Sequence, residues 1–476
     1  MTKIESFGIR ISVDATGVHV APSSTLERWP VLDSRGVLLA HAYGMLLRGH
    51  MGPDLTVENG EIHVKVPIET PRAFESIVTD NLHGILIFIT EGSIGRRVYP
   101  DFVFSIPLVY CPETRMAGGS ANEILDDTEY DRRFMRERHT KFIAKRRGYG
   151  WIPGTMTVHQ GVYRVLPNHY LDLDSFTTHR FWPRADEYEF GTSLEACVEE
   201  SARSVQSYIE ACADQYDCAL TLTAGYDSRV LLCGARNVID RISLFTFDIP
   251  GAELDTLTAV QICTDLGLRH KVLPIQRAEG EALLRWDRMV GDAVQDMNRV
   301  SHPTLATLPN DIILTGTHGA GKCSYYQNEL STINSIKLTA ESVAARLKFP
   351  GDAEVIAEME AWLEPISWLS NSAILDLALG EIRNGCWAMA QAPIQKAMKP
   401  VFLPHAQRSI WALWLQLRPE QTGDRQVFDA ACEILWPEAL KIPRNRYGDY
   451  RDTIAKLSKL KDFRKVLRYI RIRLAI

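Results

Sequence analysis

The spacing of apolar and polar residues divides the chain into two halves. Residues 1 to about 185 carry short apolar or alternating stretches separated by Gly, Pro and Asn, which predict strands. Examples are Ile62–Val66, Gly84–Thr90 and Phe102–Ile106. A charged stretch, Asp126–Arg147, interrupts them and is predicted to be an exposed helix or a loop. The first half is therefore expected to consist mainly of strands.

From about Ser193 the pattern changes to strands that alternate with helices. Leu194–Tyr216 has one apolar stripe at helical spacing, and an apolar strand, Cys218–Leu222, follows it. A helix opening at Val230–Ala235 comes next, and further elements are expected at Ile242–Phe247, Ala252–Leu266, Lys271–Pro274 and Asp311–Leu314, with mostly helices from about 335. Apolar strands that alternate with helices are typical of a parallel sheet covered on both faces.

Composition and charge exclude several classes of protein. The 476 residues are 46% hydrophobic and 24% charged, which indicates two or three globular domains and excludes a disordered or collagenous chain. The net charge of −6 gives no whole-chain argument for nucleic-acid binding. The cysteines are scattered without metal-site spacing, and neither a secretory signal nor a long apolar run is found. We therefore expect a cytoplasmic protein.

The turn after the strand Cys218–Leu222 carries the clearest chemical signal. A strand that passes through small residues into a helix directs backbone N–H groups and the helix N-terminus toward one point, which suits pyrophosphate. Gly225 permits close approach, and Thr223 and Ser228 offer hydroxyl groups. Asp227 suits an accompanying Mg²⁺, because a carboxylate repels the phosphate itself. The alternative is that Asp227 or Ser228 only caps the helix.

This turn, Thr223–Ser228, resembles the SGGxDS pyrophosphate loop of the asparagine synthetase family, and other segments are similar to that family at comparable spacings. In the second half these are Asp255, Ala259, Leu266-Gly267 and His270, then Leu314-Thr315-Gly316, Glu381-Ile382-Arg383 and Pro400–Leu403. In the first half they are Leu82-His83-Gly84, Asp101 with Pro107–Tyr110, and Gly161–Asn168. The likeness extends loosely over almost the whole chain.

The resemblance implies an α/β protein with three parts. Residues 1–185 would form an Ntn-hydrolase-like α+β β-sandwich, the glutaminase-like domain. Residues 190–450 would form an asparagine synthase-like ATP-binding domain, with a parallel sheet of the adenine-nucleotide α-hydrolase type and a helical C-terminal part. Residues 451–476 would form a basic amphipathic helix.

The resemblance also implies an ATP- and Mg²⁺-dependent, AMP-forming ligase that adenylates a carboxylate and passes the acyl group to ammonia or a substrate amine. It assigns the binding of ATP and pyrophosphate to ten residues, namely Leu222, Thr223, Ala224, Gly225, Tyr226, Asp227, Ser228, Arg229, Phe247 and Gly316. Asp227 would also be the metal ligand. Glu381 would orient or deprotonate the amine, unless it forms a structural ion pair. Lys441, Arg444 and Arg446 would supply positive charge to the departing pyrophosphate, unless they are ordinary surface cations.

The chain departs from the family at several positions. Met1-Thr2 stands in place of the N-terminal Cys-Gly pair, so we expect glutamine hydrolysis to be lost. Asn59-Gly60-Glu61 is better explained by a hairpin turn than by glutamine binding. Ala224 replaces a glycine, and Ala320-Gly321 replaces a stretch with a metal-binding acid. Mg²⁺ would then depend on Asp227, phosphate oxygens and water, and His318 or Lys322 could neutralise phosphate unless that loop faces solvent.

The basic C-terminal segment leaves three interpretations open. Residues 441–476 hold twelve Lys or Arg and three Asp, and apolar residues recur there at helical spacing. The segment could dock as a helix with a solvated basic face, lie on the anionic inner face of the membrane, or attract nucleic acid, which is the weakest of the three.

Three functions also stay open. The first is the ligase, acting on a sugar acid, an amino acid or a peptide carboxylate, the last as in lasso-peptide macrolactam cyclases. The second is a non-catalytic pseudoenzyme of the same fold that binds nucleotide or a partner. The third is an ATP pyrophosphatase acting on tRNA, which the glutaminase-like first half disfavours.

Overall fold

The computed structural model describes residues 7–447 and residue 452, except for 103–104, 147–148, 318, 320–322 and 350. The predictions for His318, Ala320, Gly321 and Lys322 lie outside the described residues. The same holds for the basic helix at 451–476, of which only Asp452 is described.

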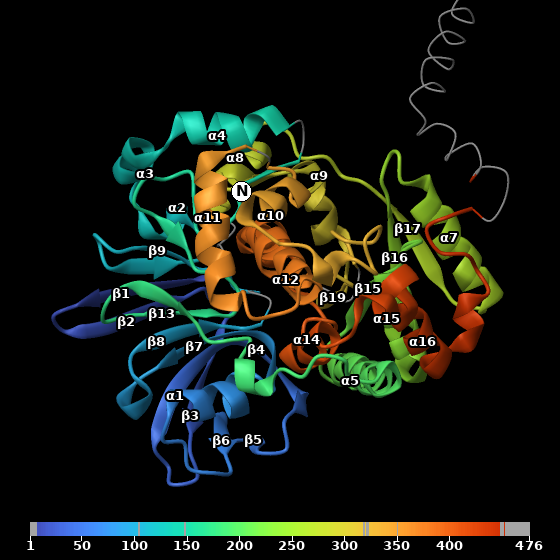
Figure 1. Ribbon diagram of the computed structural model, residues 1–476, viewed down its shortest axis with the longest axis horizontal. Helices are drawn as coiled ribbons and strands as arrows, with labels where there is room; N and C mark the ends of the chain where they lie inside the picture. The colour runs from blue at the N-terminus through green and yellow to red at the C-terminus, as the bar shows by residue number, and fades with distance from the viewer. Residues whose placement is uncertain are drawn as a thin grey trace, which may run out of the picture.

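Two mostly antiparallel sheets make up the first half, on the left of Figure 1. The larger has the order β14 (Thr177–Arg180), β13 (His169–Asp172), β8 (Arg97–Pro100), β7 (Leu82–Thr90), β4 (Leu38–Met51), β3 (Glu27–Leu32), β6 (Glu61–Val64) and β5 (Leu55–Glu58). The smaller has the order β12 (Tyr163–Arg164), β9 (Val109–Cys111), β10 (Met116–Gly118), β1 (Ile9–Asp14) and β2 (Gly17–Pro22). The prediction of a strand-rich first half is confirmed.

Two local predictions in this half have different outcomes. The hairpin between β5 and β6 is confirmed, because Asn59 and Gly60 both have positive φ, 52° and 82°, as a type I′ turn requires. The predicted strand Phe102–Ile106 is wrong for its described residues. The Asp101 carboxylate accepts the N–H of Ser105 at 2.7 Å and the N–H of Leu86 at 3.2 Å, which bends the chain between β8 and β9.

Short helices form the charged interruption, as one of the two interpretations predicted. They are α3 (Asp127–Arg133), α4 (Arg136–Phe142) and the 3₁₀ turn η3 (Ala144–Arg146), after α1 (Pro71–Phe74), the π-helical turn η1 (Glu75–Thr79) and α2 (Ala121–Ile124). The Asp126 carboxylate caps α3 by accepting the N–H of Glu129 at 2.8 Å.

A five-stranded parallel sheet forms the centre of the second half. Its order is β17 (His270–Pro274), β16 (Ile242–Asp248), β15 (Cys218–Thr221), β19 (Ile312–Leu314) and β20 (Val401–Phe402), and every neighbouring pair is parallel. All five carboxyl ends therefore meet at one edge, as the alternation of strands and helices predicted.

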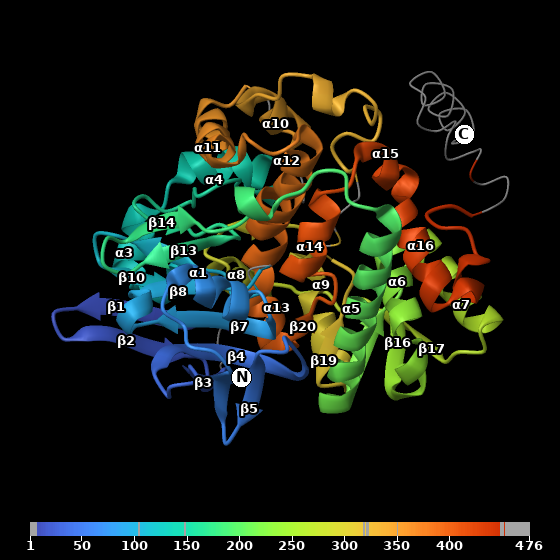
Figure 2. The same ribbon diagram turned by 60° about the horizontal axis from the view of Figure 1, so that its bottom comes forward.

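Helices cover one face of this sheet, and a small apolar core lies on the other face. On one face α5 (Leu194–Gln215), α6 (Tyr226–Gly234) and α16 (Gln426–Leu435) pack together (Figure 2). On the other face Ala219, Phe245 and Ile313 form a small core with Leu308. The helix after β15 begins at Tyr226, four residues before the predicted opening at Val230. The remaining helices are α7 (Glu253–Asp265), α8 (Glu281–Met289), α9 (Met297–Ser301), α10 (Ala340–Arg346), α11 (Ala353–Leu363), α12 (Asn371–Leu377), α13 (Ala392–Met398), α14 (Arg408–Leu415) and α15 (Pro419–Thr422).

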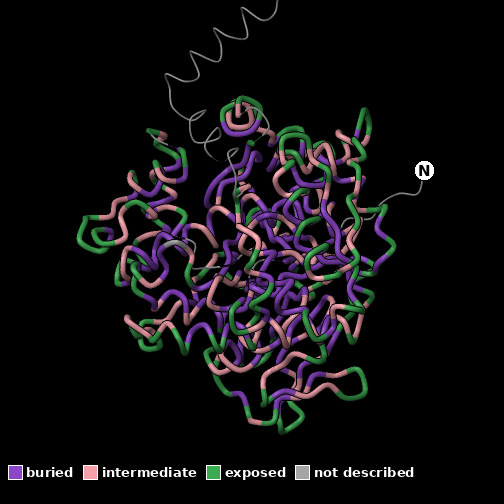
Figure 3. The backbone as a smooth tube through the Cα atoms, turned by 90° about the vertical axis from the view of Figure 1, so that its right-hand side faces the viewer, coloured by how far each residue is buried: buried purple, intermediate pink, exposed green. Residues whose placement is uncertain are grey.

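The two halves share one core. A small sheet pairs β11 (Gly150–Trp151) with β18 (Val294–Gln295), and the largest cluster of buried apolar residues draws on both halves. In Figure 3 the buried segments run through the interior, and exposed segments lie at the periphery. Packing between the halves therefore fixes the position of each relative to the other.

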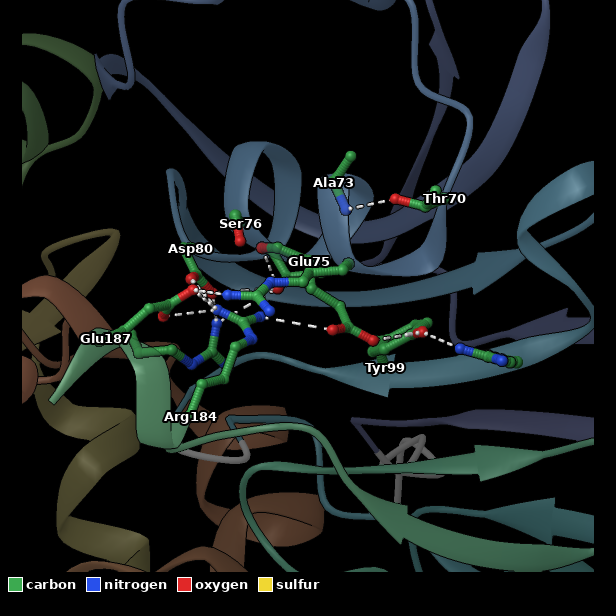
Figure 4. A network of polar contacts seen from close by, with 12 residues as sticks. Thr70, Ala73, Glu75, Ser76, Asp80, Tyr99, Arg184 and Glu187 are labelled. Atoms are coloured by element: carbon green, nitrogen blue, oxygen red, sulfur yellow. Dashed lines mark hydrogen bonds and ion pairs between the residues drawn. The ribbon is translucent and has the colours of Figure 1, made fainter.

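A cluster of ion pairs lies where the two halves meet (Figure 4). Within the first half, Arg184 contacts Glu75 at 3.4 Å and Asp80 at 3.7 Å. Arg408 of α14 also contacts Asp80 and so connects the second half to this cluster. The Tyr99 hydroxyl donates to Glu75 at 3.0 Å. Burial raises the pKa of Glu75, and the Tyr99 and Arg184 contacts act against that rise. Every acid in this cluster has a cation or hydroxyl partner, so the cluster stabilises the junction.

All nine cysteines are buried with free thiols. Within the part of the chain that the structure describes, no helix combines the length and the apolar character that crossing a bilayer requires.

Candidate functional site

The turn predicted to bind pyrophosphate joins β15 to α6 at the carboxyl edge of the parallel sheet. Leu222, Thr223 and Ala224 form the turn, Gly225 is the N-cap of α6, and Tyr226, Asp227 and Ser228 form its first turn. We call residues 222–228 the β15–α6 turn. Gly225 has an ordinary φ of −77°, and Ala224 is not among the residues with positive φ, so alanine there brings no backbone strain.

The N–H groups of the turn are mostly used within the protein, which differs from the prediction. The N–H of Thr223 donates to Ser228 Oγ at 3.1 Å, that of Ala224 to Asp255 Oδ1 at 2.9 Å, and that of Gly225 to Thr223 Oγ1 at 3.2 Å. These bonds hold the turn in one conformation. The N–H groups available for an anion are therefore those of the first turn of α6, which by helix geometry have no intrahelical acceptor.

The predicted second loop lies against the first. Gly316 follows β19, and a Cβ added to it would lie 2.6 Å from Asp227 Cβ and 2.9 Å from the backbone nitrogen of Ser228. Only glycine permits this close approach. The structure therefore brings together Gly316 and Asp227, two residues that the family resemblance assigned to the nucleotide site.

The predicted cationic cluster also lies beside the turn. The N–H of Asn445 donates to the carbonyl of Ala224 at 2.9 Å, and the Arg444 guanidinium lies 4.9 Å from the ring centroid of Tyr226. Arg444 is ion-paired with Asp429 of α16. Lys441 and Arg446, on the same segment, are exposed. Of this segment's cations, Arg444 therefore contacts the turn through Tyr226.

One further cation was missed by the sequence analysis. Arg425 immediately precedes α16, has a left-handed φ of 59°, and lies 4.8 Å from the ring centroid of Tyr226. Tyr226 is therefore flanked by two guanidinium groups. No local pattern marks Arg425, because its position depends on how α16 packs against α6.

Arg229 has a different role from the predicted one. Its side chain is fully buried, and its guanidinium donates to the carbonyls of Ala439 at 2.6 Å and Ile442 at 3.0 Å. Burial lowers the pKa of Arg229. Arg229 therefore stabilises the position of the chain that leads into the cationic segment, and these carbonyls are its hydrogen-bond acceptors in place of pyrophosphate.

Glu381 is also a structural residue, so its predicted action on an amine is corrected. Arg180 donates to both carboxylate oxygens, at 2.8 and 2.7 Å, and Asn168 and Trp362 each donate at 2.7 Å. Glu381 is 1% exposed, and none of these partners belongs to the β15–α6 turn. Its carboxylate connects the two halves, as the alternative of a structural ion pair anticipated.

Phe247 lines a cavity of about 210 Å³ at the carboxyl edge of the sheet. The ends of four strands contribute to it, with Thr221 from β15, Phe247 from β16, Thr315 after β19 and Val401 from β20. Thr221 and Thr315 directly precede Leu222 and Gly316. The cavity is therefore adjacent to both loops.

Asp227 is the one predicted metal ligand. It is partly exposed in the first turn of α6, beside Gly316. Within the described ranges, no group of three or more His, Cys, Asp or Glu side chains could hold a metal ion by itself. A divalent cation at Asp227 would therefore take its remaining ligands from a nucleotide and water, as Mg²⁺ commonly does.

No known protein family matches the chain, and no curated protein has a significantly similar sequence.

Proposed function

We propose that the protein is an ATP- and Mg²⁺-dependent, AMP-forming amide ligase of the asparagine synthetase type. In this proposal the second half is a synthetase domain of the adenine-nucleotide α-hydrolase type, and the first half is an Ntn-hydrolase-like sandwich without glutaminase activity. One observation carries the proposal, the close packing of Gly316 and the cationic segment 441–447 around the β15–α6 turn.

The reaction would proceed in two displacements. A carboxylate oxygen of the substrate attacks the α-phosphorus of ATP, and the bond to the pyrophosphate breaks, which gives an acyl-adenylate. An amine nitrogen then attacks the acyl carbon, AMP departs with the bonding electrons, and the amine loses a proton. Such phosphoryl chemistry depends mainly on positioning and on electrostatic stabilisation of charge.

The residues of the site suit these needs. In this proposal the N-terminus of α6, with Arg425 and Arg444 beside Tyr226, stabilises the departing pyrophosphate. Phe247 offers an apolar surface for adenine at the end of β16. Asp227 fits a single-carboxylate Mg²⁺ site, and the ion, when bound, neutralises phosphate charge.

A second candidate is a non-catalytic nucleotide-binding protein of the same fold. The observation that favours it is the internal use of the Thr223, Ala224 and Gly225 N–H groups, which stabilises the turn without a ligand. A macrolactam cyclase remains within the first proposal, with a peptide as the source of both carboxylate and amine.

Measurements of ATP binding and of AMP formation separate these proposals. Binding of ATP with Mg²⁺ is measured by calorimetry, and AMP and pyrophosphate are quantified with pools of carboxylic acids and ammonia. The ligase predicts AMP formation that Asp227→Ala abolishes, whereas the binding protein predicts ATP affinity without AMP. The control is Asp240→Ala, an exposed acid just before β16 at the opposite edge of the sheet. Equal turnover of Asp227→Ala and wild type would refute the ligase proposal.

A further inference from the structure

The cavity beside the two loops has an apolar wall. Ile249, Ile275, Leu305, Ile313, Val401 and Leu403 contribute aliphatic side chains to it. On the opposite side, Trp387 and Ala388 lie at the end of η9 (Ala378–Ala388), an 11-residue π-helix. Long π-helical segments are rare and occur frequently at functional sites. Most of the surface that a ligand would meet here is hydrocarbon.

Three amide side chains in the wall are neutral and hydrogen-bonded to one another. Asn298 and Gln395 donate to Gln391 Oε1 at 2.8 and 2.9 Å, and Gln391 donates to Asp296 behind the wall at 2.8 Å. This chain of amides orients the side chains without adding charge to the cavity.

The described lining of the cavity includes a lysine and no carboxylate. Among the described residues that line it, none is Asp or Glu, and Lys396 of α13 is the one Lys or Arg. Lys396 is 4% exposed and donates to the carbonyl of Ser105 at 2.7 Å. An ammonium group in this cavity would lose its hydration without gaining a carboxylate partner, which is unfavourable.

The position of the cavity connects it to the proposed reaction. Its rim includes Thr221 and Thr315, each one residue before a loop of the nucleotide site, and Gly316 of the second loop touches Asp227. A group seated in the cavity can therefore direct a carboxylate toward the space between the loops. A cavity of about 150 Å³ is sufficient for benzene, so a volume of about 210 Å³ accommodates an aromatic ring with a short chain.

We propose that this cavity binds the acyl group of an apolar monocarboxylic acid, aromatic or branched, that carries no α-ammonium group. The inference rests on the proposed ligase function and specifies its substrate class. It argues against aspartate-like and other free amino acid substrates, because none of the described lining residues is an acid that could pair with their ammonium group. In this proposal adenine contacts the part of the cavity lined by Phe247, and the acyl group occupies the part lined by α13.

Two acids of nearly equal size test the proposal directly. 3-Phenylpropanoate and L-phenylalanine differ by the α-ammonium group alone. Their binding to the full chain is measured by ligand-observed NMR, with and without Mg²⁺ and α,β-methylene-ATP. We expect 3-phenylpropanoate to bind at least tenfold more tightly than L-phenylalanine. Equal or tighter binding of L-phenylalanine, or no binding of 3-phenylpropanoate, would overturn the proposal.

Variants then locate the bound acid. Ala392→Leu fills the cavity from α13, and Ala397→Leu is the matched control, since Ala397 is on the same helix but does not line the cavity. We expect Ala392→Leu to weaken the binding of 3-phenylpropanoate at least tenfold and to leave the affinity for ATP within twofold of that of the wild type. Ala388→Val, on η9, repeats the test if Ala392→Leu melts at a lower temperature than the control.

The outcomes separate this inference from the proposed function. If Ala392→Leu weakens the binding of ATP and not that of the acid, the cavity holds the nucleotide base. The inference is then wrong, while the ligase proposal stands. Unchanged binding of both ligands also overturns it. If the wild type binds the acid without nucleotide but never binds ATP, the ligase proposal fails and the acyl cavity is retained.

Discussion

Replacement of Gly316 by alanine tests the contact between the two loops of the proposed nucleotide site. The added Cβ would lie 2.6 Å from Asp227 Cβ, 2.7 Å from the Asp227 carbonyl carbon and 2.9 Å from the Ser228 nitrogen. Ordinary Cβ contacts begin at 3.4 Å, so the loops must separate by about 0.8 Å. Two of the three atoms are backbone atoms, so no side-chain rotation can relieve the overlap.

Overpacking of this kind typically costs about 1–3 kcal/mol. For a domain of about 200 residues this corresponds to a fall in melting temperature of at least about 2 °C. The same displacement moves the N-terminus of α6 relative to Gly316. Since a misplacement of about 1 Å can reduce a rate on the order of 100-fold, we expect ATP affinity or turnover to fall by about 10- to 100-fold.

The control is Gly225→Ala in the same turn. Gly225 has a φ of −77°, and a Cβ there would meet Thr223 Oγ1 at 3.3 Å, an overlap of about 0.1 Å. We expect its melting temperature to match that of the wild type. Thermal unfolding followed by fluorescence, together with calorimetric titration of ATP and Mg²⁺, measures both effects. A Gly316→Ala protein with wild-type stability and ATP affinity would refute the reasoning that the loops are in contact.

Substitutions at three further residues test the structural roles assigned to polar side chains. Glu381→Gln should lower stability by about 3–5 kcal/mol, because it leaves the buried Arg180 without its charge partner. Burial acts to raise the pKa of Glu381, but Arg180 and the hydrogen bonds outweigh it and hold that pKa below the ordinary value of 4.5. The loss of stability caused by Glu381→Gln should therefore be full above about pH 4.5. It should become smaller as the pH falls through the pKa of Glu381 in the folded protein. The free energy of unfolding is measured with urea. A loss of this free energy that did not depend on pH between 3 and 7 would contradict the role of Glu381. Asp255→Ala should destabilise the turn by about 1–2 kcal/mol, because Ala224 N–H loses its acceptor, whereas Asp255→Asn should resemble the wild type in the same assay. Arg229→Met should release the chain at Ala439–Ile442 and accelerate trypsin cleavage after residue 444, and an unchanged cleavage rate would argue against this anchor.

The sequence allowed much of the second half to be predicted. Apolar runs of strand length that alternate with amphipathic stripes specify a parallel sheet, and each element of β15, α6, β16, α7 and β17 appears within four residues of its expected position. Local spacing and strand direction are sufficient for such predictions. Gly316 was assigned to the site through the family resemblance, and the structure adds its contact with Asp227, since both residues follow the carboxyl ends of adjacent parallel strands.

The functions of single polar side chains were predicted less well. Glu381 and Arg180 are 201 residues apart in the sequence, so no local spacing reveals their ion pair. Arg229 follows the turn directly, yet its guanidinium is buried and donates to the carbonyls of Ala439 and Ile442. Arg425 was not predicted at all, and α16 brings it to Tyr226.

The amino-acid sequence by itself determined the elements, the parallel sheet and the place of the turn, because these depend on the periodicity of neighbouring residues. The tertiary structure decided which cations reach the turn and which carboxylates are used in ion pairs between the halves. It also decided that the described residues lining the cavity beside the loops include no acidic side chain. Those features arise when distant segments pack together, since burial and pairing are properties of the assembled interior.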